Sequence, residues 1–203
     1  PFLMPSDYEQ ADRLLKETVL ALEVETGEPY RGFLYGQFMA AREGIRVIEY
    51  NVRLGDPEAL NLMAILESDA APLLLSIAAG KLRVEQVSFK GQASVSKYLV
   101  PQEYPNAISA PIEFEFDPGL LTEFGLSLIC GSVERKGPKD WLALGSRTLG
   151  IVGLEDAPEV VSKRIEAFIE TAAIPQLRHR QDIGSKDILL KKTAKMNEIR
   201  HDL

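Results

Sequence analysis

An alternating segment that stops at a sharp turn constrains the fold of this chain more than any other feature. Residues 47–54 read as a β-strand, and a Gly-Asp-Pro turn follows at residues 55–57. Side chains two residues apart in a strand project from the same face, so Glu49, Asn51 and Arg53 are predicted to share one face. A carboxylate and an amide oxygen suit a magnesium ion that also carries phosphate oxygens. A guanidinium can grip an oxyanion beside it.

The segment before this strand is the predicted partner in a hairpin. Residues 32–40 read as a strand, and residues 42–44 as a three-residue loop whose glycine adopts a left-handed conformation. Counted back in antiparallel register, Gln37 faces Glu49 directly, with their Cβ atoms roughly 5 Å apart. Three oxygen ligands, Gln37, Glu49 and Asn51, would then surround one point, which is the predicted metal site. A two-residue Glu-Gly turn would instead shift the register and scatter this set.

Several of these residues also have simpler interpretations. An E-x-N-x-R strand taken alone is usually a solvated strand face, so the metal hypothesis depends on Gln37. Asp56 and Glu58 flank a proline at a predicted helix start, where acidic residues commonly cap the helix and favour the positive end of its dipole. His179 lies in a polar turn, where a lone histidine is usually structural. Arg147, on a later predicted strand, is an alternative phosphate contact.

The residues around the turn resemble a family signature. The segment 49–58, EYNVRLGDPE, is similar to the E-F-N-x-R-F-G-D-P-E signature of the phosphoribosylamine–glycine ligases, which are ATP-grasp enzymes of purine biosynthesis. Residues 30–36, 146–153 and 179–184 resemble further landmarks of that family, in the same order and with an archaeal-like style. The two departures within the signature are a tyrosine and a leucine where phenylalanine is usual, and they leave the predicted ligand positions untouched.

The resemblance implies a reaction and a role for each site residue. The family joins glycine to 5-phosphoribosylamine through glycyl phosphate, consuming ATP and giving glycinamide ribonucleotide, ADP and phosphate. It implies Mg²⁺ or Mn²⁺ held by Gln37, Glu49 and Asn51, with Glu49, Asn51 and Arg53 forming the cofactor-binding set. Arg53 and Asp56 are the predicted catalytic residues, Arg53 at the transferring phosphate and Asp56 near the amino substrates. A neutral Gln37, where many ATP-grasp enzymes use a carboxylate, is expected to weaken one metal position.

The resemblance also implies an α+β fold in two parts. Residues 1–85 resemble the C-terminal portion of an ATP-grasp domain, an antiparallel sheet with helices. Residues 86–203 resemble the small, mixed, β-rich C-terminal domain with helices that follows it in the family. The expected partners are ATP, glycine, 5-phosphoribosylamine and the N-terminal part of the same ligase. Since the lysines that hold the nucleotide belong to that other part, the fragment alone is expected to be inactive.

Local patterns agree with this organisation. Helices are predicted at residues 6–27, 57–66, 70–79 and 185–200, from apolar residues at helical spacing and from their Ser, Pro and Gly boundaries. A further helix is predicted to be capped by residues 156–159 and to carry apolar residues from 160 to 169 on one face. Strands are predicted at residues 93–100, 111–116, 126–133 and 141–152, which are separated by turn-forming residues.

Composition excludes several classes of protein. A net charge of −7 argues against non-specific nucleic-acid binding, because no basic surplus exists to neutralise backbone phosphates. The single cysteine, Cys130, permits no internal disulfide and fits a reducing compartment. No apolar run approaches the about 20 residues of a membrane span, and no signal-peptide pattern opens the chain. A cytoplasmic protein with neither nucleic-acid nor membrane partners is expected.

Two other functions remain open at this point. A different ATP-grasp carboxylate–amine ligase, or a carboxylase resembling biotin carboxylase, would also carry an E-x-N-x-R strand, although the Gly-Asp-Pro-Glu continuation argues against the carboxylase. A non-catalytic association module, or half of a split enzyme, would instead present an apolar face around Phe33, Tyr35 and Met39 to a partner chain.

Overall fold

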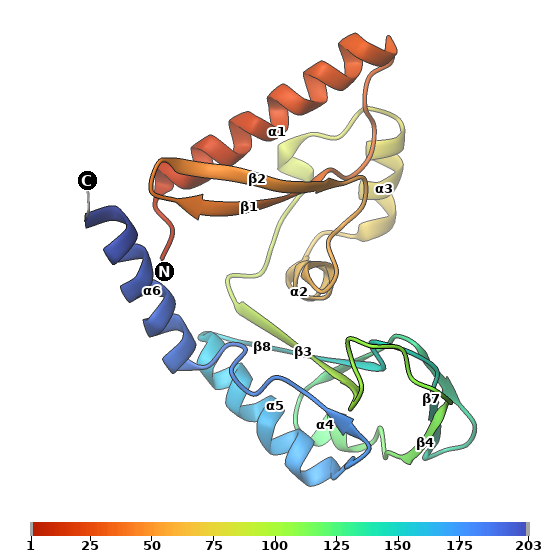
Figure 1. Ribbon diagram of the computed structural model, residues 1–203. Coiled ribbons are helices and arrows are strands. Elements are labelled where there is room, and N and C mark those ends of the chain that lie inside the picture. The colour runs from red at the N-terminus through yellow and green to blue at the C-terminus, as the bar shows by residue number, and fades with distance from the viewer. Residues whose placement is uncertain (1, 202–203) are drawn as a thin grey trace. The chain divides into compact units, whose positions relative to one another are not determined.

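A computed structural model of the protein describes residues 2–201 and shows an α+β chain with antiparallel sheets (Figure 1). The helices are α1 (Pro5–Thr26), α2 (Glu58–Ile65), α3 (Ala70–Ala78), α4 (Leu120–Glu123), α5 (Pro158–Ala172) and α6 (Lys186–His201), with a short 3₁₀ helix, η1 (Val84–Gln86). The strands are β1 (Tyr35–Ala41), β2 (Gly44–Asn51), β3 (Ala93–Pro101), β4 (Ile112–Glu115), β5 (Ser127–Cys130), β6 (Val133–Arg135), β7 (Asp140–Ala143), β8 (Leu149–Glu155) and β9 (Leu177–Arg178). The predicted α+β class is confirmed. Within residues 2–201, no helix is long and apolar enough to cross a membrane.

Contacts divide the described chain into two compact units. The first contains residues 2–59, 66–89 and 189–201, and the second contains residues 60–65 and 90–188. Most of α6 joins the first unit, where Arg200 forms an ion pair with Asp7 and donates a hydrogen bond to the carbonyl of Phe2. The assignment of residues 1–85 and 86–203 to two family domains stays a prediction.

In the first unit, α1 lies along one face of the β1–β2 hairpin (Figure 1). Ile45 is buried, and its backbone N–H donates to Gln10 Oε1 at 2.7 Å. Near the other end of β2, Thr18 Oγ1 donates to the hydroxyl of Tyr50 at 2.8 Å. Because Tyr50 points towards α1, the residues on either side of it in β2 point to the opposite face of the hairpin.

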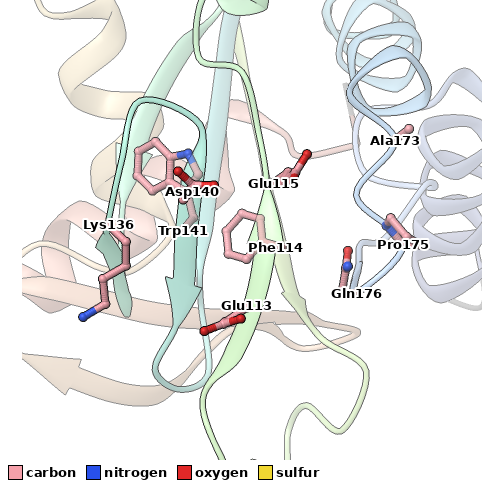
Figure 2. Close-up of a pocket in the computed structure, with 9 residues that line it drawn as sticks. All are labelled: Glu113, Phe114, Glu115, Lys136, Asp140, Trp141, Ala173, Pro175 and Gln176. Atoms are coloured by element: carbon pink, nitrogen blue, oxygen red, sulfur yellow. The ribbon is translucent and has the colours of Figure 1, made fainter.

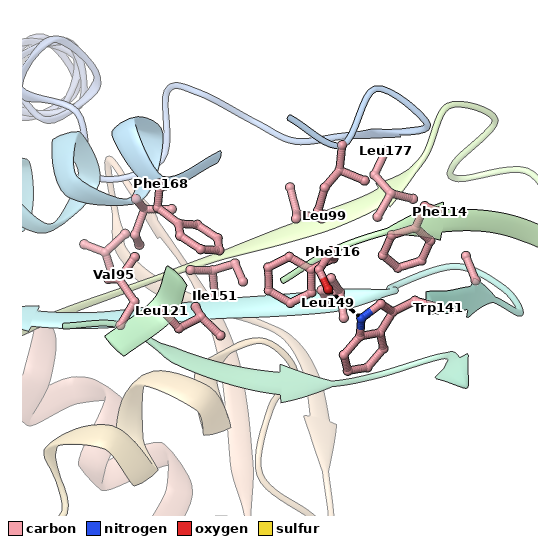
Figure 3. Close-up of a cluster of buried hydrophobic side chains, with 14 of the residues drawn as sticks. Val95, Leu99, Phe114, Phe116, Leu121, Trp141, Leu149, Ile151, Phe168 and Leu177 are labelled. Carbon is pink, nitrogen blue, oxygen red and sulfur yellow. Dashed lines mark hydrogen bonds between the residues drawn. The ribbon is translucent and has the colours of Figure 1, made fainter. Parts of the chain in front are cut away.

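The second unit contains two antiparallel sheets. One has the strand order β5-β8-β3-β9 and the other the order β4-β7-β6. The helix α5 packs on β8 and β3 and buries Val161, Ile165 and Phe168 completely. Figure 3 shows Phe168 in the same cluster as Phe116, Leu149 and other buried side chains of both sheets. One apolar core therefore joins both sheets and the helix.

Two of the predicted strands are each divided in the structure. The predicted strand 126–133 forms β5 and β6, and the predicted strand 141–152 forms β7 and β8; in each case the two halves belong to different sheets. The chain changes sheet next to a close backbone contact, where a Cβ on Gly131 would lie 2.3 Å from the carbonyl oxygen of Arg147. The prediction of two continuous strands was wrong because this contact joins segments far apart in sequence.

A buried ionic cluster connects three segments of the second unit. Lys97 on β3 is fully buried, and its Nζ donates to Glu166 Oε1 at 2.6 Å, to Ser162 Oγ at 2.9 Å and to the carbonyl of Gln181 at 3.0 Å. His179 Nε2 lies 2.9 Å from Glu166 Oε2. The structural role predicted for His179 is confirmed, since its ring holds a polar turn against α5.

Candidate functional site

The predicted pairing of Gln37 with Glu49 is present, although the predicted hairpin loop is wrong. The loop has two residues, Arg42 and Glu43, because β1 ends at Ala41, β2 begins at Gly44 and these two residues pair. If the pairing continued from this loop without interruption, Gln37 would pair with Ile48, one residue before Glu49. The register instead shifts between Gln37 and Phe38, with Phe38 opposite Val47 and Gln37 opposite Glu49. The extra residue, Ile48, forms a bulge that restores the pairing.

Four polar side chains share the hairpin face that points away from α1. Tyr35 and Gln37 are two residues apart on β1, and they pair directly with Asn51 and Glu49 on β2. The amide nitrogen Nδ2 of Asn51 donates to Glu49 Oε1 at 2.9 Å, which confirms that these two side chains project together. Gln37 and Glu49 are exposed, and Asn51 is half-buried.

The strand ends before it reaches Arg53, so the expectation that Arg53 continues the alternation is wrong. β2 stops at Asn51, and residues 52 and 53 form a bend. The guanidinium Nη1 of Arg53 donates to the carbonyl of Leu54 at 2.8 Å. Asp56 follows in the exposed turn that leads to α2. Arg53 and Asp56 therefore belong to the segment that leaves the hairpin, while the three proposed metal ligands lie on its strands.

Tyr35 and Glu58 extend this polar group; the sequence alone indicated Glu58 as an acid at the helix start that supports the site indirectly, and Tyr35 as part of an apolar face. The Tyr35 hydroxyl donates to Glu58 Oε1 at 3.1 Å. Partial burial, followed by the hydrogen bond and negative charge of Glu58 and the charge of Glu49, raises the pKa of Tyr35. The alternation of β1 predicts that Tyr35 shares a face with Gln37, because Tyr35 lies two residues before it.

The side chains on this face fit a hard divalent cation. They provide one carboxylate and two amide side chains, which are oxygen donors of the type that Mg²⁺ and Mn²⁺ accept. Asn51 turns its nitrogen towards Glu49, so its amide would have to rotate for both residues to place oxygens on one ion. Among residues 2–201, no three His, Cys, Asp or Glu side chains are grouped so that they could hold a metal ion by themselves. This site would therefore depend on water and phosphate oxygens for its other ligands.

A hollow in the second unit contains none of the predicted site residues. It has a volume of about 590 Å³ and is lined by β4, β7 and the segment after α5 (Figure 2). Figure 2 shows carboxylates of Glu113, Glu115 and Asp140 around it, with Lys136 at one side.

Arg147, the alternative phosphate contact, lies elsewhere in the second unit, with its guanidinium 5.5 Å from the ring centre of Tyr98.

Comparisons with known proteins show what the chain is similar to. The family described as phosphoribosylglycinamide synthetase, ATP-grasp (A) domain, matches residues 1–59. The phosphoribosylamine–glycine ligase of Methanopyrus kandleri is 39% identical over 202 residues, 98% of this chain and 45% of that protein. The ligase of the same name from Methanocaldococcus jannaschii is 38% identical over 200 residues, with 98% and 44% covered. The chain therefore spans a little under half the length of these relatives.

Solved structures show the same relationship at the level of the fold. The phosphoribosylamine–glycine ligase of Thermotoga maritima superposes with a TM-score of 0.68 at 25% identity, covering 90% of this chain and 44% of that one. The biotin carboxylase domain of a thermophilic 2-oxoglutarate carboxylase superposes with a TM-score of 0.57 at 20% identity, covering 97% and 44%. The second likeness shows a shared fold alone.

Proposed function

Because this chain is a homologue of one part of phosphoribosylamine–glycine ligase, an ATP-grasp enzyme, we propose that it supplies the C-terminal part of such a ligase. The observation that carries the proposal is the pairing of Gln37 with Glu49 across the hairpin, next to the hydrogen bond from Asn51 to Glu49. Glu49 and Asn51 belong to the segment that resembles the family signature, and the register of the hairpin places Gln37 opposite Glu49 on the same face.

Each site residue then has a proposed role. Gln37, Glu49 and Asn51 would hold Mg²⁺ or Mn²⁺, and the bound ion would neutralise the charge that develops on the ATP phosphates. Arg53 would bind the transferring phosphate or the acyl phosphate, and Asp56 would orient the amino group of a substrate. Both lie on the segment that follows β2, so a turn of only a few residues would place them beside the metal ligands.

The proposed reaction has two steps. An oxygen of the glycine carboxylate attacks the γ-phosphorus of ATP, so that a new P–O bond forms, the bond to ADP breaks and glycyl phosphate results. The amine of 5-phosphoribosylamine then attacks the acyl carbon, and inorganic phosphate leaves as the amide forms. Both steps depend on positioning and on stabilisation of negative charge more than on covalent help from the protein.

The test is release of ADP and phosphate in the presence of ATP, Mg²⁺, glycine and 5-phosphoribosylamine. It would use this chain alone and this chain combined with the remaining portion of a related ligase. Activity in the combination alone, lost again in a combination carrying Glu49→Gln, would support the proposal. Activity of the isolated chain would overturn it, because this chain would then bind ATP without the other portion.

One observation favours the association module as a second candidate. Met39 is 56% exposed and Phe33 is 37% exposed, so both side chains are accessible to a partner chain. If these residues form a partner-binding face, the folded chain would show no ligase activity in any combination. It would then bind a partner in a way that Met39→Lys weakens and Glu49→Gln does not.

A further inference from the structure

A contact between Tyr35 and Glu58 joins the two ends of the segment between β2 and α2, and the proposed reaction gives this contact no role. Tyr35 pairs with Asn51, the last residue of β2, and its hydroxyl donates to Glu58, the first residue of α2. The six residues 52–57 therefore leave the hairpin and enter the helix beside the same tyrosine. Arg53 and Asp56 both lie within this closed segment.

The closed segment also packs against this contact. Gly55 is buried, and a Cβ at this position would lie 2.5 Å from Glu58 Oε2 and 3.0 Å from Cζ of Tyr35. The carboxylate and the ring therefore occupy the space above Gly55. The carbonyl of Gly55 accepts a hydrogen bond from the backbone N–H of Ala59 at 2.8 Å. Two contacts thus fix Gly55: the Tyr35 ring and the Glu58 carboxylate fill the space where a side chain would lie, and its carbonyl is hydrogen-bonded to Ala59.

We propose that Glu58 is a positioning residue that, through Tyr35 and Gly55, fixes the turn carrying Arg53 and Asp56 beside the Glu49–Asn51 end of β2. The positional part of this inference stands on the contacts alone. Its functional part, that the turn must be fixed for Arg53 and Asp56 to meet their substrates, rests on the proposed function. An acidic residue that only caps α2 would not need the tyrosine of a neighbouring strand.

Site-resolved amide hydrogen exchange of the full chain tests the positional part. In Glu58→Ala, exchange at the amide of Ala59, which donates to the carbonyl of Gly55, is expected to accelerate at least tenfold, while the amides of the β3–β8 ladder keep their rates. Glu58→Gln retains an acceptor for the tyrosine hydroxyl and is expected to restore slow exchange. Tyr35→Phe is expected to accelerate the same amide, and Tyr35→Phe combined with Glu58→Ala should add little to Glu58→Ala alone.

The matched control is Glu43→Ala, which removes an exposed carboxylate that pairs with Arg46 at 2.5 Å on the same hairpin. Its effect on residues 53–59 should be less than twofold. Unchanged exchange in Glu58→Ala would overturn the inference. Equal acceleration in Glu58→Gln and Glu58→Ala would also overturn it, because the contact with Tyr35 would then be irrelevant.

Kinetics of the combined ligase tests the functional part. Glu58→Ala is expected to raise the KM for glycine or 5-phosphoribosylamine about tenfold with less than a twofold change in the KM for ATP, and Glu58→Gln should restore it. If the combined ligase has no activity even with wild-type sequence, the proposed function fails while the exchange result still stands. If the combined ligase is active and Glu58→Ala leaves its kinetics unchanged, the functional part of the inference fails.

Discussion

Glu49 is the only carboxylate among the three proposed metal ligands. Gln37 and Asn51 are neutral amides, so Glu49 provides the charge that binds a divalent cation. Glu49→Gln is nearly isosteric and lies at an exposed position, so the fold should not change. In the combined ligase, turnover is expected to fall by at least about a hundredfold, the magnitude typical of losing one electrostatic contact to a transition state. Steady-state turnover would measure this, with circular dichroism as the check on folding; near-normal turnover would contradict the metal assignment.

Thr148 carries a polar atom that the fold leaves unpaired. Thr148 is fully buried, and within the described part of the chain its Oγ1 has no hydrogen-bond partner. An unsatisfied buried hydroxyl costs about 1–3 kcal/mol, and an apolar group of the same shape removes that cost. Thr148→Val is therefore expected to stabilise the protein by about 1 kcal/mol and raise its Tm by roughly 2–4 °C.

Thermal unfolding would measure the effect of Thr148→Val. The control is Thr171→Val, since Thr171 Oγ1 is exposed and donates to the carbonyl of Ala167 at 2.8 Å. This change should alter the free energy of unfolding by no more than about 0.5 kcal/mol. A Thr148→Val protein less stable than the wild type would mean that the hydroxyl has a partner, such as a buried water.

At the scale of elements, the hairpin was predictable and its loop was not. The alternation of β2 and the Gly-rich boundary of β1 are local signals, and they placed Glu49 and Asn51 on one face correctly. The bulge at Ile48 adds one residue to β2 at a position that no local pattern of residues marks. The predicted pairing of Gln37 with Glu49 was therefore right although the loop that led to it was wrong.

The divided strands have a similar cause. β5 and β6 are separated by Gly131, whose backbone approaches that of Arg147, and β7 and β8 are separated in the corresponding region. The breaks contain Gly-Ser pairs at residues 131–132 and 145–146, and sequence reasoning continued each strand through them because apolar residues lie on both sides. Arg53 lies beyond the end of β2 for the same reason, since alternation alone does not mark where pairing stops.

This close approach gives a prediction at the same scale. A methyl group at Gly131 would lie 2.3 Å from the backbone oxygen of Arg147, so one of the two segments would have to move. Gly131→Ala is expected to lower the free energy of unfolding by about 1–3 kcal/mol, the range found when an added group forces neighbouring backbone to shift. Gly91→Ala is the matched control, because a Cβ at Gly91 would meet nothing within 4 Å. Urea denaturation would compare the two, and equal stability of both variants would contradict the close contact.

At the scale of the whole molecule, the α+β class and the family resemblance were predictable because several landmarks occur in one order along the chain. The division into two compact units was only partly visible, since α6 follows the second unit in sequence yet groups largely with the first. The contact of Arg200 with Asp7 joins residues at opposite ends of the chain. No local sequence pattern at Arg200 or Asp7 predicts that these two residues form an ion pair.

The cluster around Lys97 predicts how the stability of the second unit depends on pH. Burial opposes ionisation of Glu166, but the hydrogen bonds and charges of Lys97 and His179 outweigh it and lower the pKa of Glu166 below its usual 4.5. Ionised Glu166 therefore stabilises the fold fully above the pKa of the unfolded chain, and this contribution is lost as pH falls through the lower pKa of the folded chain.

Glu166→Gln tests this pH dependence. Because the fully buried Lys97 would lose its charged acceptor, the free energy of unfolding at pH 7 is expected to fall by about 1–3 kcal/mol. The acid-induced loss of stability below pH about 4.5 should also be shallower than in the wild type. Urea denaturation at a series of pH values would measure both effects, with Glu170→Gln, an exposed position on the same helix, as the control. If Glu166→Gln and Glu170→Gln lost stability equally at low pH, the contribution of the Lys97 cluster to acid unfolding would be disproved.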